Sequence, residues 1–146
     1  MRKKIKQILV PYDGTKSSER AFNDALNIAK KYEAELKILT CIRDVATFGF
    51  FKTKADKKLI EKQKNMATKK IEVLKKNAQK NNVSVKSKIV KADLVSEKII
   101  DYAKSEKVDL IVMSRTKYGT AAEKLHNEST VEKVFHEAPC SFLHVN

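Results

Sequence analysis

The sequence predicts an α/β domain built on a single, doubly wound, five-stranded and mainly parallel sheet with helices on both faces. Short apolar runs of strand length alternate with longer segments whose apolar residues recur every three or four positions. No Gly/Pro/Ser-rich linker and no repeat interrupts this alternation, so residues 1–146 read as one domain. A chain of 146 residues buries about two-thirds of its unfolded surface. Such alternation is typical of βαβ units with right-handed crossovers.

The chain begins with a strand and a helix. Residues 6–11 form an apolar run that ends at Pro11, and the turn-forming Tyr12-Asp13-Gly14 follows. Beyond Ser17 the apolar positions are Ala21, Phe22, Ala25, Ile28, Ala29 and Tyr32. That spacing predicts one buried face of a helix. Residues 36–42 are then expected to form a second buried strand.

The middle of the chain is expected to hold a loop, a long helix and an edge strand. Residues 43–53 contain several Phe residues without a clear period and indicate a loop. The long helix has its inner face at Ile60, Ala67, Ile71, Leu74 and Ala78. Residues 83–90 alternate apolar and polar side chains. One polar face favours a position at the edge of the sheet.

The remaining elements are a helix, a central strand, a short last helix and a final strand. They are expected at residues 95–103, 108–113, 129–137 and 141–145. Ser129 or Thr130 is the expected N-cap of the last helix, because a hydroxyl can accept a hydrogen bond from a first-turn N–H. Pro139 lies beyond the end of that helix.

The ligand site is expected beyond the carboxyl ends of the strands, where the strand order reverses. Three strand ends are candidates: Pro11-Tyr12-Asp13, Thr40-Cys41-Ile42 and Met113-Ser114-Arg115.

Three motifs along the chain resemble the universal stress protein family. Residues 8–15 (Ile-Leu-Val-Pro-Tyr-Asp-Gly-Thr) resemble its opening I-L-V-P-x-D-G-S. Residues 108–113 (Val-Asp-Leu-Ile-Val-Met) resemble its V-D-L-I-V-M-G, and residues 138–145 resemble its closing A-P-C-P-V-L-V-V. Their order and spacing hold over the whole chain. The resemblance implies strand order 3-2-1-4-5, a regulatory role in stress response exerted through partners, and ATP or another adenine nucleotide as ligand.

The phosphate end of that implied site departs from the family. Members that bind ATP carry a G-x-x-G-x9-G-[ST] loop after the fourth strand, whose backbone N–H groups approach the phosphates. Laid on this sequence, the glycines fall on Ser114, on Lys117 and near Asn127 or Glu128, followed by Ser129. None of them is glycine. Arg115 and Lys117 offer cations instead, so weak or altered phosphate binding is expected.

The adenine end matches better. By resemblance, Asp13 meets the base beside a wall of Pro11 and Tyr12, Cys41 lends backbone to the adenine edge, and Met113 and Ser114 lie beside the ribose. The complete predicted nucleotide-binding set is Pro11, Tyr12, Asp13, Cys41, Met113, Ser114, Arg115, Lys117, Ser129 and Thr130. Two plainer interpretations stay open. Asp13 is also a typical helix-entry residue, and Met113 a typical core residue.

Catalysis and metal binding are not favoured by the residue patterns. The serines fit turns and caps better than nucleophiles, and His126, His136 and His144 are scattered. The sequence holds no GxxxxGK[ST] loop, no GxGxxG and no cluster with metal-ligand spacing. A slow nucleotide hydrolase stays an alternative that the resemblance permits.

Charge suggests a second alternative, a polyanion-binding or nucleic-acid-binding protein. The net charge is +13. Segment 52–80 holds eleven lysines against Asp56, Glu61 and Glu72. Such a segment is either a solvated helix face or an attachment surface for non-specific nucleic acid.

Location and assembly complete the expectations. Cys41 and Cys140 lie in apolar strand-like runs and read as reduced, buried thiols, which favours the cytoplasm. The apolar runs are too short to span a membrane. Residues 141–145 would form an unpaired edge strand, so a homodimer through this strand is expected.

Overall fold

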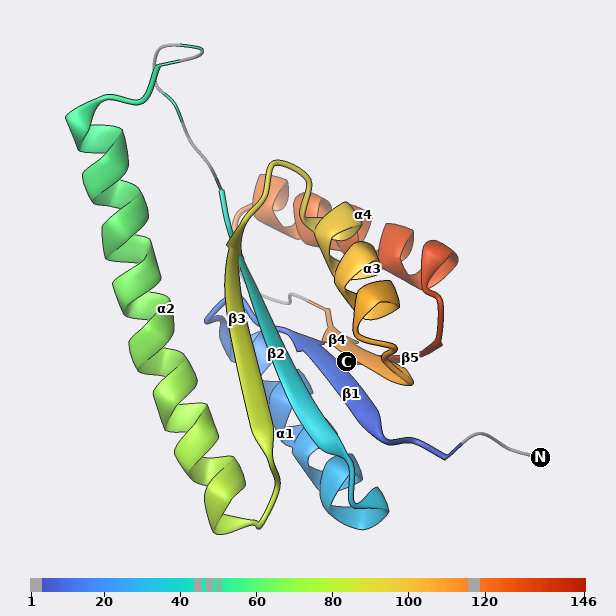
Figure 1. The fold of residues 1–146 in the computed structure, drawn as a ribbon. Helices are drawn as coiled ribbons and strands as arrows, with labels where there is room; N and C mark the ends of the chain where they lie inside the picture. Colours follow the sequence, from blue (N-terminus) through green and yellow to red (C-terminus); the bar gives the residue numbers. More distant parts are fainter. Residues whose placement is uncertain (1–3, 44–45, 47–48, 50, 116–118) are drawn as a thin grey trace.

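Within residues 4–43, 46, 49, 51–115 and 119–146, which the computed structural model describes, strands and helices alternate along the chain. They are β1 (Gln7–Pro11), α1 (Lys16–Tyr32), β2 (Glu35–Ile42), α2 (Lys54–Lys80), β3 (Val85–Lys91), α3 (Val95–Ser105), β4 (Leu110–Ser114), α4 (Ala121–Glu137) and β5 (Ser141–Val145). The strands form one parallel sheet in the order β3-β2-β1-β4-β5 (Figure 1). The predicted fold class, strand order and edge position of the third strand are confirmed.

Two apolar cores lie on opposite faces of the sheet, because successive strand residues point to opposite sides. Ile8 and Val10 of β1 belong to the core shared with α1 and α2, where Phe22 is fully buried. Leu9, the residue between them, belongs to the core shared with α3 and α4. Helices therefore cover both faces (Figure 1).

The helix α2 is much longer than the strand it follows and the strand it precedes. At 1.5 Å per residue its 27 residues span about 40 Å, whereas the seven residues of β3 span about 23 Å. Its amino-terminal part consequently extends past the sheet (Figure 1). Four of the five predicted inner-face residues are buried, and Ala67 is half-buried. None of the described helices is apolar and long enough to cross a bilayer.

The start of α4 corrects the prediction. The helix begins at Ala121, two turns before the predicted start at Ser129. Its N-cap is Thr120 rather than Ser129 or Thr130. The Thr120 Oγ1 accepts from the Glu123 N–H (3.1 Å), and the Thr120 N–H donates to Glu123 Oε2 (3.3 Å). This reciprocal pair is a capping box, and it places Ser129 and Thr130 inside the helix.

Candidate functional site

A cavity of about 350 Å³ opens above the carboxyl ends of β1, β2 and β4, on the face covered by α3 and α4. This is where the strand order reverses, since the chain runs from β1 to β2 and β3 on one side and then returns from β3 to β4 on the other side of β1. Seven of the ten predicted site residues line it: Pro11, Tyr12, Asp13, Cys41, Met113, Ser114 and Thr130. Strand ends far apart in the sequence therefore meet in one hollow.

Asp13 is held by the first turn of α1. Its Oδ1 accepts three hydrogen bonds, from Thr15 N (3.0 Å), Thr15 Oγ1 (2.6 Å) and Ser18 Oγ (2.8 Å). Thr15 is in turn the N-cap of α1. All hydrogen bonds recorded for the carboxylate among the described residues end on Oδ1, which leaves Oδ2 as an acceptor for a ligand. Both interpretations of Asp13, helix entry and ligand contact, are thus compatible with one side chain.

The turn beside Asp13 is fixed to β2. The Tyr12 N–H donates to the Leu39 carbonyl (2.9 Å), and the buried Thr40 hydroxyl donates to the Tyr12 carbonyl (2.8 Å). Burial, with Glu19 and Asp13 adding to it, raises the pKa of Tyr12 to about 12. The phenol is therefore neutral at physiological pH, and Tyr12 lines the cavity.

The floor of the cavity is apolar. Leu39, Ile99 and Met113 are buried and also belong to the core between the sheet and helices α3 and α4. Met113 thus serves core packing and the cavity wall together. An apolar floor under a rim of polar groups is the usual composition of a small-molecule site.

The Cys41 thiol is expected to react slowly. Burial raises its pKa to about 11, so about one thiol in a thousand is ionised at pH 8. Iodoacetamide at pH 8, followed by peptide mapping, should modify Cys41 at least tenfold more slowly in the folded protein than in urea. The rate should rise about tenfold per pH unit up to pH 11. Equal rates in the two states would show that the thiol is not shielded.

The outer wall comes from one stripe of α4, formed by Glu123, His126, Asn127 and Thr130. Their spacing of three and four places them on one face of the helix. Glu123 and Asn127 were not among the predicted site residues, and the predicted start of the last helix at residue 129 left His126 outside it. The signal was present in the sequence as Thr120-x-x-Glu123, which is the pattern of a capping box.

Two of the other three predicted site residues, Arg115 and Ser129, are not part of the described cavity lining. Arg115 lines a neighbouring hollow, where its guanidinium lies 3.9 Å from a Glu128 carboxylate oxygen. Ser129 is exposed on α4, away from the cavity lining. Lys117 lies outside the described residues.

Two features of this cavity disfavour a polyphosphate. Its lining, as far as the structure describes it, contains the carboxylates of Asp13 and Glu123 and no Lys or Arg. In addition, residues 127–129 lie inside α4, where their N–H groups bond to carbonyls four residues earlier. Those N–H groups are not available to bind phosphate oxygens. In the described parts of the chain, no group of three or more His, Cys, Asp or Glu could hold a metal ion.

Comparison of the chain with known proteins identifies its family. The model of the universal stress protein family matches residues 4–146. A universal stress protein of Methanocaldococcus jannaschii is 31% identical over 139 residues, which cover 94% of this chain and 80% of that protein.

Solved structures agree with the sequence matches. The universal stress protein UspA from Lactobacillus plantarum superposes with a TM-score of 0.84 at 25% identity, covering 99% of this chain and all of that one. A universal stress protein from Archaeoglobus fulgidus, solved in complex with dAMP, has a TM-score of 0.68 at 16% identity and covers 99% of this chain and 100% of its own. At that identity the likeness concerns the fold alone.

Proposed function

This chain belongs to the universal stress protein family, and from that premise we propose that it is a regulatory module that binds an adenine nucleotide or a related adenine ligand. The site would be the cavity above β1, β2 and β4. The observation that carries the proposal is the convergence of Pro11, Asp13, Cys41 and Met113 on this one hollow. The module would act in stress response through partners, in the cytoplasm, rather than by turnover.

The polarity of the cavity supports an adenine ring there. A carboxylate acceptor at Asp13 Oδ2 suits the exocyclic amine of adenine, which is a hydrogen-bond donor, whereas guanine presents a carbonyl at the same place. The apolar floor that Leu39, Ile99 and Met113 form suits the faces of a flat ring. The dAMP complex of the Archaeoglobus fulgidus protein supports the view that this fold accommodates adenine nucleotides.

Weak phosphate binding is the second part of the proposal. It is supported by the carboxylates that line the cavity and by the helical N–H groups of residues 127–129. Adenosine should then bind at least as tightly as ATP.

Two measurements test this function. The first is mass spectrometry of the purified protein after denaturation, which reports any nucleotide that is carried along. The second is calorimetric titration with adenosine, AMP and ATP, with guanosine as the matched control. Binding of guanosine as tight as that of adenosine, or no binding of any of the four at millimolar concentration, would overturn the proposal.

Assembly into a homodimer through β5 is part of the same proposal. The strand lies at the edge of the sheet, and its Leu143 is 37% exposed. Phe135 of α4 is 57% exposed and packs edge-on against Phe142 of β5, with ring centroids 5.6 Å apart. A second copy of β5 would satisfy the open backbone groups and cover these side chains.

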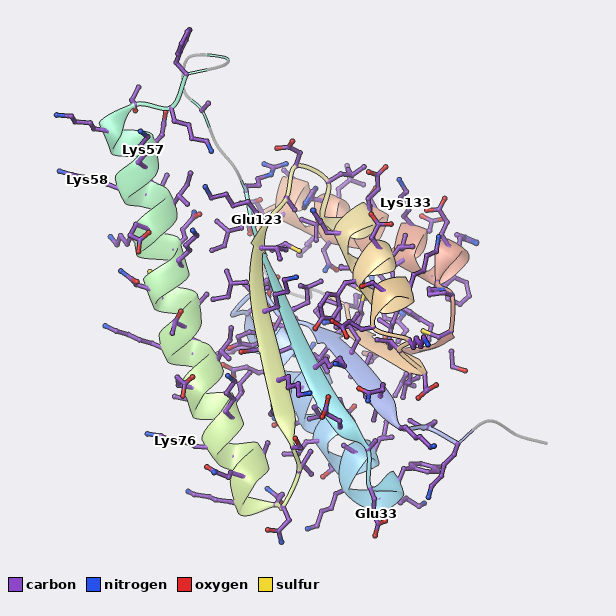
Figure 2. The ribbon with its side chains drawn as sticks, viewed as in Figure 1. Glu33, Lys57, Lys58, Lys76, Glu123 and Lys133 are labelled. Atoms are coloured by element: carbon purple, nitrogen blue, oxygen red, sulfur yellow. The ribbon has the colours of Figure 1, made fainter. Side chains whose placement is uncertain are left out.

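The outer surface of α2 supports a second candidate function, binding of polyanions. Eight of its lysines are exposed: Lys54, Lys57, Lys58, Lys62, Lys69, Lys70, Lys76 and Lys80. Figure 2 shows Lys58 and Lys76 pointing away from the sheet.

Duplex DNA should therefore bind this surface only non-specifically. We expect a Kd on the order of 10⁻⁴–10⁻⁶ M near physiological salt, weakening steeply as salt rises because bound counterions are released. Fluorescence anisotropy over a salt series, with two unrelated duplexes, measures this. Nanomolar binding to one of the duplexes that persists at high salt would instead make nucleic acid the main ligand.

A further inference from the structure

The geometry points to a second ligand site, an anion pocket for a phosphate-bearing small molecule between the Tyr12–Gly14 turn and the middle of α2. The hollow has a volume of about 280 Å³. Its polar lining comes from Asp13, Thr40, Arg43, Gln63 and Lys70. The adenine-binding proposal makes no use of Arg43, Gln63 or Lys70.

This pocket lies on the other face of the sheet from the adenine cavity. Leu39 lines the adenine cavity, whereas Thr40 and Ile42 line the second pocket. Successive strand residues point to opposite faces, so this alternation separates the two hollows. Tyr12, Asp13 and Cys41 border both. The turn at the end of β1 is therefore the wall between the two hollows.

The charges of the two hollows are opposite in sign. The described lining of the adenine cavity carries two carboxylates, Asp13 and Glu123. The second pocket carries two cations, Arg43 and Lys70, and shares only Asp13 as an anion. The Oδ1 atom of that carboxylate already accepts three hydrogen bonds on the α1 side. The second pocket is the hollow with the positive balance.

Lys70 is oriented toward the pocket by the turn itself. Its Nζ donates to the Gly14 carbonyl at 3.0 Å, which leaves two of its three N–H donors for a ligand. Gly14 has a φ of +83°, and a Cβ at this position would lie 3.0 Å from the Lys70 Nζ. A glycine thus permits both the turn and the close approach of the ammonium group.

The chemistry of these donors identifies the ligand class. A guanidinium presents five N–H donors in a planar fork that matches a phosphate group, and an ammonium adds a point charge beside it. The Gln63 amide contributes a neutral donor and an acceptor. The volume suits an inorganic phosphate, a pyrophosphate or a small phosphate ester.

Pyrophosphate binding by two single-lysine variants tests this site. Lys70→Ala is compared with Lys69→Ala, which removes the same charge from the preceding position of α2. Lys69 is also exposed and does not line the pocket. Calorimetric titration with sodium pyrophosphate at constant ionic strength should show a loss of about tenfold for Lys70→Ala, equivalent to about 1.4 kcal/mol. Lys69→Ala should change the affinity less than twofold, and Arg43→Ala should weaken it like Lys70→Ala.

Three results would contradict the proposal that this pocket binds a phosphate-bearing ligand. One is an equal loss for both lysine variants, which would mean attraction by overall charge alone. Another is the absence of saturable pyrophosphate binding up to 10 mM, about the limit of a specific weak site. The third is competition between pyrophosphate and adenosine, which would make the two hollows one site. Failure of adenosine to bind at all would count against the proposed function and leave the pyrophosphate titration to decide on this pocket.

Discussion

An Asp13→Asn variant is expected to exchange adenosine for inosine as the better ligand while keeping its fold. The asparagine retains an oxygen that can accept from Thr15 and Ser18, as Asp13 Oδ1 does. In place of Oδ2 it presents an amide N–H₂ group, which repels the adenine amine and suits the 6-carbonyl of inosine. The loss of one hydrogen bond to a charged group costs about 1.5–3 kcal/mol, so adenosine should bind roughly ten- to 150-fold more weakly.

Titration of both nucleosides and a thermal melt of each variant separate the two roles of Asp13. Asp13→Ala serves as the control, because it removes the acceptor of Thr15 and Ser18 as well and should lower the melting temperature. An Asn variant that keeps full affinity for adenosine would mean that the carboxylate serves only the entry of α1.

A Leu143→Lys variant is expected to be monomeric where the wild-type protein is dimeric. A two-fold axis through the β5 edge would bring two copies of the new ammonium group into one apolar contact. Each buried ion carries a desolvation penalty of several kcal/mol. Two of them should weaken the dimer by roughly a thousandfold or more.

Sedimentation equilibrium over the micromolar range measures this change. Val73→Lys is the matched control, because Val73 is 67% exposed on α2, the helix on the opposite flank of the sheet. It should leave the dimer intact. A wild-type protein that sediments as a monomer throughout the range would contradict the proposal that β5 forms a dimer interface.

The inner strands β1, β2 and β4 were predictable from sequence because they are largely buried apolar runs. Ile8 of β1, Leu36 of β2 and Ile111 of β4 are fully buried. The first half of α4 was not predictable in this way, because it has almost no buried face. Leu125, its largest apolar side chain, is 69% exposed, so no apolar period marks the helix. Polar capping by Thr120 and Glu123 starts the helix instead.

The same division applies to the candidate site. Pro11, Asp13, Cys41 and Met113 were found because strand ends of a parallel sheet meet at one edge. Glu123 and Asn127 were missed because their position depends on where α4 begins. The Arg115 guanidinium lies beside Glu128 in the neighbouring hollow, which a sequence pattern does not reveal. Whether these residues bind a nucleotide stays a prediction.

The central position of β1 has a consequence for synthesis on the ribosome. One edge of β1 pairs with β2, and the residues of this pairing all lie within the first 39 of the chain. The other edge can pair only after β4 has been synthesised. The Gln7 N–H likewise donates to the Asp109 carboxylate, 102 positions later in the chain. The 23 residues from Ala92 to Ser114, the end of β4, take about 1–5 s to translate at about 5–20 residues per second. During that interval a nascent three-stranded half-sheet exposes the strand that later becomes the middle of the protein. Its apolar face and open edge are a natural target for chaperones.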